Sequence, residues 1–154
     1  MAIVTIFTSG YCRGEDVAQG LVETLTYQRL EDAKIFAVAE QRFGMEPKQL
    51  SRAMHEPPGL FNSITRGREK GIAYLRAAIL DCIEGDDLVY LGFGGHLLPD
   101  TLTHVLRVCL VAEGSYRVQQ AVKSEGVSKR KAAALVRRRD EQSAMWTETL
   151  CRSR

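Results

Sequence analysis

Residues 8–16 hold the strongest chemical signal in this chain. An apolar, β-branched run at about residues 2–7 leads into a turn with glycines at positions 10 and 14, and an amphipathic helix follows at about 15–25. A helix N-terminus with free backbone N–H groups attracts anions, because the helix dipole is positive there. We therefore predict a phosphate-binding loop composed of Ser9, Gly10, Tyr11, Cys12, Arg13, Gly14 and Glu15.

The charges in this turn are unusual for a phosphate site. In the motif G-x-x-x-x-G-K-[ST] the last glycine is followed by a lysine that reaches the outer phosphates and a hydroxyl that binds Mg²⁺. Here those positions are Glu15 and Asp16. Either Arg13 replaces the missing lysine, or the segment is an ordinary strand-to-helix turn whose acids complement the helix dipole.

Two further groups of residues could contact a ligand. A second glycine-rich loop, with Gly92, Gly94, Gly95 and His96, follows the apolar run at 88–91. His96 could contact a substrate there or simply close the turn. A basic group, Arg137, Arg138 and Arg139, precedes Asp140 in a predicted helix. Consecutive helical residues point about 100° apart, so one or two of these arginines could face a phosphate, or all could form a solvated face.

Other chemistries find little support. The spacing of the three histidines and four cysteines contains neither a H-E-x-x-H motif nor a C-x-x-C pair, so we predict no metal site. Cys12 could be a reactive thiol beside Arg13, but we interpret it as an unremarkable one. The basic C-terminal quarter offers only Trp146 beyond Tyr116 for stacking on bases, which makes nucleic-acid binding unlikely.

Composition sets the class of protein. The chain has 154 residues, of which 45% are hydrophobic and 26% charged, with a net charge of +2. We predict one domain over residues 1–154, no membrane-spanning segment, no secretory signal and reduced thiols, and hence a cytoplasmic location. Strand patterns at 2–7, 88–91 and 105–111 alternate with helix patterns at 15–25, 31–43, 47–55, 68–83, 115–123 and 128–152, which predicts an α/β fold with a parallel sheet.

Six segments carry a family resemblance: residues 3–18 around Gly14, 50–56, 71–78, 88–96, 106–108, and 137–141 with Trp146. Together they resemble the cytidylate kinase-like family of P-loop nucleotide kinases, over nearly the whole sequence. The resemblance implies a three-layer α/β/α fold and transfer of the γ-phosphate of ATP, with Mg²⁺, to a nucleoside monophosphate, typically CMP. It also implies acceptor-side and lid-like helical parts at about 31–70 and 128–150.

The resemblance assigns roles to the candidates. Arg139 and Asp16 would be catalytic, the second glycine loop would lie at the acceptor, and Arg137, Arg138 and Asp140 would belong to the lid. The chain departs from the family pattern at Glu15, and at Ser143 and Trp146, which occupy lid positions where an acid and an arginine are usual. The family usually continues through another strand, whose loss would expose the strand at 105–111 to a second copy or another protein.

Three functions remain open from the sequence. The protein could be an active ATP-dependent phosphotransferase acting on a nucleoside monophosphate. It could instead be a nucleotide-binding or regulatory protein of the same fold without catalysis, as the replacement of the lysine by Glu15 suggests. The third alternative is an interaction module that binds no nucleotide and assembles through its basic helix and open sheet edge.

Overall fold

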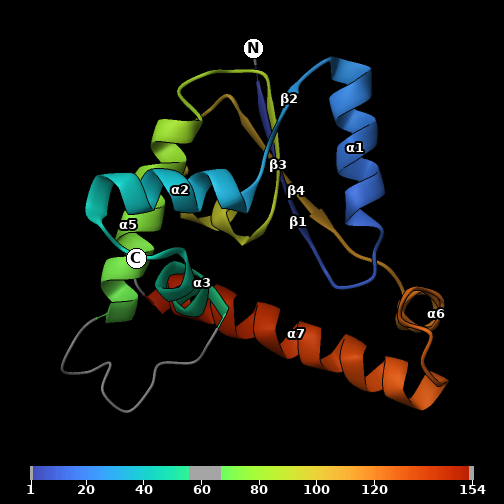
Figure 1. Cartoon of the computed structure of the whole chain (residues 1–154). Helices are drawn as coiled ribbons and strands as arrows, with labels where there is room; N and C mark the ends of the chain where they lie inside the picture. The colour runs from blue at the N-terminus through green and yellow to red at the C-terminus, as the bar shows by residue number, and fades with distance from the viewer. Residues whose placement is uncertain (1, 56–66, 153–154) are drawn as a thin grey trace.

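The protein is a parallel α/β structure, seen in a computed structural model that describes residues 2–55 and 67–152 (Figure 1). The chain runs through β1 (Ile3–Thr8), α1 (Gly14–Leu25), β2 (Gln28–Leu30), α2 (Asp32–Phe43), α3 (Pro47–His55), α5 (Gly67–Cys82), β3 (Leu88–Leu91), the 3₁₀ helix η1 (Phe93–Leu97), β4 (Val105–Leu110), α6 (Gly114–Glu125) and α7 (Lys129–Arg152). Residues 56–66, in the predicted acceptor-side part, lie outside the described residues.

The sheet has the order β2-β3-β1-β4 and every pair is parallel. The apolar runs that predicted three of these strands are β1, β3 and β4. Their carboxyl ends meet at one edge of the sheet, where ligand sites of parallel sheets form. The predicted α/β fold is confirmed.

Two layers of helices enclose the sheet because successive strand residues face opposite sides. Val4, Ile6 and Val89 pack with Ala18 of α1 on one face. On the other face, Ile3 and Tyr90 belong to a larger core that includes side chains of α2, α3 and α5. Figure 1 shows α1 on one side of the sheet and α2 and α5 on the other, while α7 passes beneath the carboxyl ends of the strands.

β4 is an edge strand: within the described residues it pairs with β1 alone. Its Leu106 is 58% exposed, and Val111, just beyond the strand, is 74% exposed. An edge strand presents unpaired backbone groups that another strand can bind. Pairing of this edge with a second copy or another protein stays a prediction. Light scattering tests the homodimer, and a monomer at high concentration would contradict it.

Candidate functional site

The turn after β1 is concave. Tyr11 and Arg13 adopt left-handed conformations with φ of 65° and 56°, while Cys12 between them does not. Such alternation turns successive N–H groups toward a common centre, which is the geometry of an anion-binding nest. Within the described residues, no hydrogen bond uses the N–H groups from Gly10 to Arg13. The loop therefore presents backbone donors at the start of α1, and its role in binding phosphate stays a prediction.

Gly14 allows this tight entry into α1. It is buried against β1, and a Cβ atom there would lie 2.9 Å from Cγ2 of Thr8. Real Cβ atoms essentially never lie this close to another carbon, so either Thr8 or the backbone at position 14 would have to shift. The glycine of the predicted loop is thus explained by packing at the junction of β1 and α1.

Both acids of the turn are paired with arginines. Glu15 lies 2.5 Å from an Nη atom of Arg29 on β2, and Asp16 lies 2.5 Å from Nε of Arg13 within the same helical turn. These pairs are largely solvent-exposed, so they add little to stability. Their effect is local, because each arginine offsets a negative charge that would otherwise face a bound phosphate.

Arg139 of α7 lies directly against the loop. Its guanidinium carbon is 4.8 Å from the centre of the Tyr11 ring, which is a cation–π distance. The hydroxyl of Tyr11 in turn donates to Glu125 at 3.0 Å. Burial, and secondarily the bond to Glu125, raise the pKa of Tyr11. Arg139 is thus the predicted lid arginine that the structure brings to the phosphate loop.

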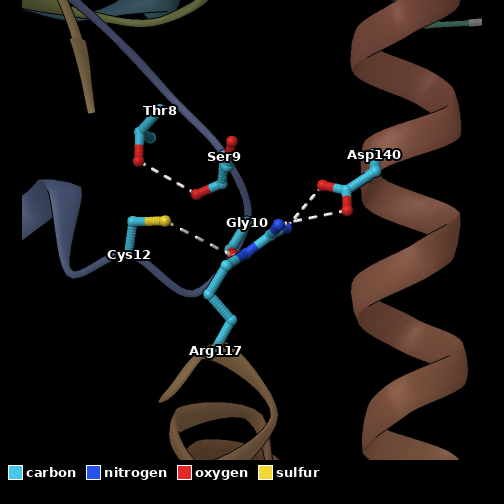
Figure 2. Close-up of polar contacts among 6 residues, drawn as sticks. All are labelled: Thr8, Ser9, Gly10, Cys12, Arg117 and Asp140. Carbon is cyan, nitrogen blue, oxygen red and sulfur yellow. Dashed lines mark hydrogen bonds and ion pairs between the residues drawn. The ribbon is translucent and has the colours of Figure 1, made fainter. Parts of the chain in front are cut away.

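Arg117 of α6 is a site residue that sequence reasoning missed. Its Nε donates to the carbonyl oxygen of Gly10 at 2.8 Å, and its two terminal nitrogens bind both carboxylate oxygens of Asp140, one of them at 3.1 Å. Figure 2 shows the side chain rising from α6 between the loop and α7. The hydrogen bond to Asp140 raises the pKa of Arg117. A signal existed, because Arg117 lies four residues before Ala121 on the buried stripe of its helix.

A cavity of about 490 Å³ opens beside the loop. Every residue from Thr8 to Glu15 lines it, and α7 adds Arg139, Gln142 and Ser143. Its apolar side is formed by Met54, Leu91 and Phe93. A volume in this range suits a nucleotide-sized ligand. Of the four lid residues Arg137, Arg138, Arg139 and Asp140, only Arg139 lines the cavity. Asp140 binds Arg117, Nε of Arg137 lies 3.9 Å from a carboxylate oxygen of Glu141, and Arg138 is exposed.

The second glycine loop mainly packs on the core. The Tyr90 hydroxyl donates to Asp32 at 2.6 Å and accepts from the N–H of Gly94 at 2.9 Å. A Cβ atom at Gly92 or Gly94 would lie 2.5 or 2.7 Å from that hydroxyl oxygen, so these glycines admit the tyrosine. Gly92, Gly95 and His96 line a separate cavity of about 160 Å³, and only Phe93 of this loop lines the larger one. Their role toward an acceptor stays a prediction.

Replacing Tyr90 by phenylalanine is expected to lower the free energy of unfolding by about 1–3 kcal/mol, because Asp32 and the Gly94 N–H lose a buried partner. Burial, and then the charge of Asp32, raise the pKa of Tyr90 well above its ordinary value. A raised pKa stabilises the fold fully below the unfolded value of about 10 and loses this effect as the pH rises toward the folded value.

The difference between wild type and Tyr90→Phe should therefore narrow above pH 10, as measured by urea unfolding at pH 8 and above pH 10. Tyr74→Phe keeps its ring stacked on Phe43 and is the matched control, with an expected change within about 0.5 kcal/mol. An equal loss in both variants would contradict the role given to the Tyr90 hydroxyl.

Trp146 anchors the C-terminal half of α7 to the core. Its side chain is fully buried, its ring N–H donates to the carbonyl of Phe93 at 3.1 Å, and it meets the Phe93 ring edge-on with centroids 6.5 Å apart. Moving a side chain of this size from the core into water exposes about 150–250 Å², which corresponds to about 4–6 kcal/mol of lost hydrophobic stabilisation at 25 cal/mol per Å². α7 is therefore a fixed wall of the cavity.

The described residues contain no cluster of three or more His, Cys, Asp or Glu with the geometry of a metal site. No helix among them is long and apolar enough to cross a bilayer.

A family model described as the cytidylate kinase-like family matches residues 3–153. The chain belongs to this family. The match spans the phosphate loop, the second glycine loop and α7, so the elements around the cavity are those of a cytidylate kinase-like protein. No curated protein matches the sequence.

One solved structure supports the fold. An uncharacterized protein from Eubacterium ventriosum superposes with a TM-score of 0.65 at 14% identity, over 93% of this chain and 73% of that one. TT1252 from Thermus thermophilus gives a TM-score of 0.46 at 16% identity, over 86% and 77% of the two chains. At such identities only the first likeness carries weight, and it concerns the fold alone.

Glu15, at the position where the P-loop motif carries its lysine, forms an ion pair with Arg29. Trp146 is fully buried in the core.

Proposed function

We propose that this cytidylate kinase-like protein binds the phosphates of a nucleotide in the loop from Ser9 to Gly14. The single observation that carries the proposal is the 490 Å³ cavity lined by the whole concave loop at the N-terminus of α1. Backbone N–H groups there bind phosphate oxygens, and the helix dipole adds to the attraction. Among the residues that the structure describes, Arg13 and Arg139 are the cations that line the same cavity.

We further propose that the reaction is transfer of a phosphoryl group to a nucleoside monophosphate. ATP, when bound, supplies the γ-phosphoryl group. The loop orients the phosphates, and Arg139 stabilises the negative charge that spreads over the transferred group. Met54, Leu91 and Phe93 offer apolar surface for a base. Asp16 as a Mg²⁺ ligand stays a prediction, and we assign magnesium no step because the Asp16 carboxylate pairs with Arg13.

Thermal unfolding with and without millimolar MgATP tests nucleotide binding, with CMP as the second ligand. A ligand at 100 times its Kd adds about 2.7 kcal/mol, which raises Tm by roughly 5–10 °C in a domain of this size. A rise with MgATP supports the phosphate site and calls for a phosphoryl-transfer assay. No rise with either ligand contradicts the proposal and favours an interaction module.

One observation favours a second candidate, nucleotide binding without phosphoryl transfer. Glu15 stands where the lysine of the motif would reach the outer phosphates, and it is held by Arg29. A protein with this substitution keeps the backbone donors of the loop but loses the cation aimed at the transferred group. A Tm rise with MgATP, together with no transfer from labelled ATP to CMP, would select this candidate.

Replacing Glu15 by lysine is expected to tighten MgATP binding by about tenfold, because a repulsion becomes an attraction that solvent only partly screens. The measurement is the Kd for MgATP by titration calorimetry. Glu23→Lys makes the same charge change on the exposed surface of α1, far along the helix, and should change the Kd by less than about twofold. An unchanged Kd in Glu15→Lys would show that position 15 does not face the phosphates.

A further inference from the structure

Arg117 connects three parts of the site. It is anchored in α6, its Nε binds the Gly10 carbonyl at 2.8 Å, and its terminal nitrogens bind Asp140 of α7 (Figure 2). The side chain is only 10% exposed although it carries a full charge. Cys12 also approaches the Gly10 carbonyl, with Sγ at 3.9 Å. The Gly10 carbonyl therefore accepts from Arg117 of α6 and from the Cys12 thiol of the same loop, while Asp140 of α7 holds the other end of the Arg117 guanidinium.

Only arginine suits this position. Its planar guanidinium presents one edge to both oxygens of a carboxylate while Nε donates elsewhere, in a rigid arrangement. A lysine ammonium at the same place is a compact charge on a flexible stem, and it cannot make the bidentate contact together with the bond to Gly10.

The bond to Gly10 determines the direction of the next N–H group. The carbonyl of Gly10 and the N–H of Tyr11 belong to one planar trans peptide and point in opposite directions. Arg117 does not line the large cavity, whereas Gly10 and Tyr11 do. If this peptide turned over, a carbonyl oxygen would replace a donor in the loop and repel a phosphate.

The support of Arg117 is itself fixed. Asp140 lies on α7, which Trp146 attaches to the core, and Arg139 of the same helix packs closely against Gly10. Gly10 thus contacts one arginine from α6 and one from α7.

We propose that Arg117 is the positioning residue of the phosphate loop: by binding the Gly10 carbonyl and Asp140 together, it keeps the Gly10–Tyr11 peptide oriented for phosphate. This inference rests on the proposed function, because the ligand it serves is the phosphate chain of a nucleotide. It adds a residue outside the cavity to the binding of that ligand.

The test compares wild type, Arg117→Lys and Asp140→Asn, with Arg130→Lys as a control that makes the same exchange at an exposed site of α7. NMR titrations with MgATP and with inorganic pyrophosphate give the affinities, and ¹⁵N relaxation of the unliganded proteins gives the order of the Gly10–Gly14 amides. The fluorescence of Trp146, the only tryptophan, reports whether α7 stays docked.

We expect Arg117→Lys and Asp140→Asn to weaken binding of both ligands about tenfold, equivalent to 1.4 kcal/mol. The loop amides should fall from an order parameter near 0.85 toward about 0.6, with unchanged Trp146 emission. Arg130→Lys should change none of these. Unchanged affinity in Arg117→Lys, even with a lower Tm, would reduce Arg117 to a stabilising residue and overturn the inference.

Failure of the proposed function gives a different result. Wild-type protein would then bind neither MgATP nor pyrophosphate. The ¹⁵N relaxation data alone would then decide whether Arg117 orders the loop. Loss of order at Gly10–Gly14 in Arg117→Lys would still support a positioning role, whereas equal order in wild type and variant would overturn it.

Discussion

Replacing Trp146 by alanine is expected to lower the free energy of unfolding by about 3–5 kcal/mol, the usual cost of deleting a large buried aromatic side chain. The indole is fully buried and its N–H donates to the Phe93 carbonyl at 3.1 Å. The variant therefore leaves a cavity and an acceptor without its donor. In a domain of this size, the loss corresponds to a fall in Tm of roughly 6–20 °C.

Urea unfolding followed by circular dichroism measures this effect, since the alanine variant contains no tryptophan. Trp146→Phe keeps much of the packing and isolates the hydrogen bond, so it should cost about 1–2 kcal/mol. Thr147→Ala, at the next and exposed position of α7, should stay within about 0.5 kcal/mol of wild type. A Trp146→Ala variant as stable as Thr147→Ala would show that α7 is not fixed to the core.

The Trp146→Ala variant should bind MgATP more weakly as well as being less stable. Arg139, Gln142 and Ser143 line the cavity from the same helix that Trp146 attaches. Below the melting temperature of Trp146→Ala, MgATP affinity is therefore expected to fall as well, because the wall of the site loses its anchor. Preserved affinity would mean that the segment near Arg139 is held by the Arg117–Asp140 pair alone.

Local sequence patterns were sufficient for most of the fold. The apolar runs of β1 and β3 and the apolar periodicity of α5 follow directly from burial on a parallel sheet. β2 was missed because it is three residues long and two of them, Gln28 and Arg29, are polar. Its pairing with β3 is determined by tertiary contact, which no short-range pattern records.

The site was predictable where it depends on the backbone and unpredictable where it depends on long-range partners. The loop from Ser9 to Gly14 could be found from its glycines and the helix that follows. Arg117 contacts Gly10 across 107 residues, and the glycines at 92 and 94 admit the Tyr90 hydroxyl rather than line the large cavity. A glycine needed for close packing and a glycine needed for ligand approach look alike in a sequence.

Replacing Gly10 by alanine is expected to weaken MgATP binding by at least about tenfold and to destabilise the fold by about 1–3 kcal/mol through overpacking. A Cβ atom at this position would lie 2.5 Å from Cδ and 3.0 Å from Cβ of Arg139. The second contact is to an atom fixed to the α7 backbone, so rotating the arginine side chain does not relieve it. The φ of Gly10 lies outside the left-handed region that favours glycine, so the effect is one of space alone.

Gly20→Ala provides the matched control, because nothing lies within 4 Å of its Cβ position and it is exposed inside α1. The same substitution there should stabilise the protein by up to about 1 kcal/mol, since alanine is the better helix former, and leave MgATP affinity unchanged. Opposite signs for one chemical change at two glycines would show that α7 presses on the phosphate loop. If Gly10→Ala binds MgATP as tightly as Gly20→Ala, the loop and α7 must be separable, and the fixed wall assigned to this site would be wrong.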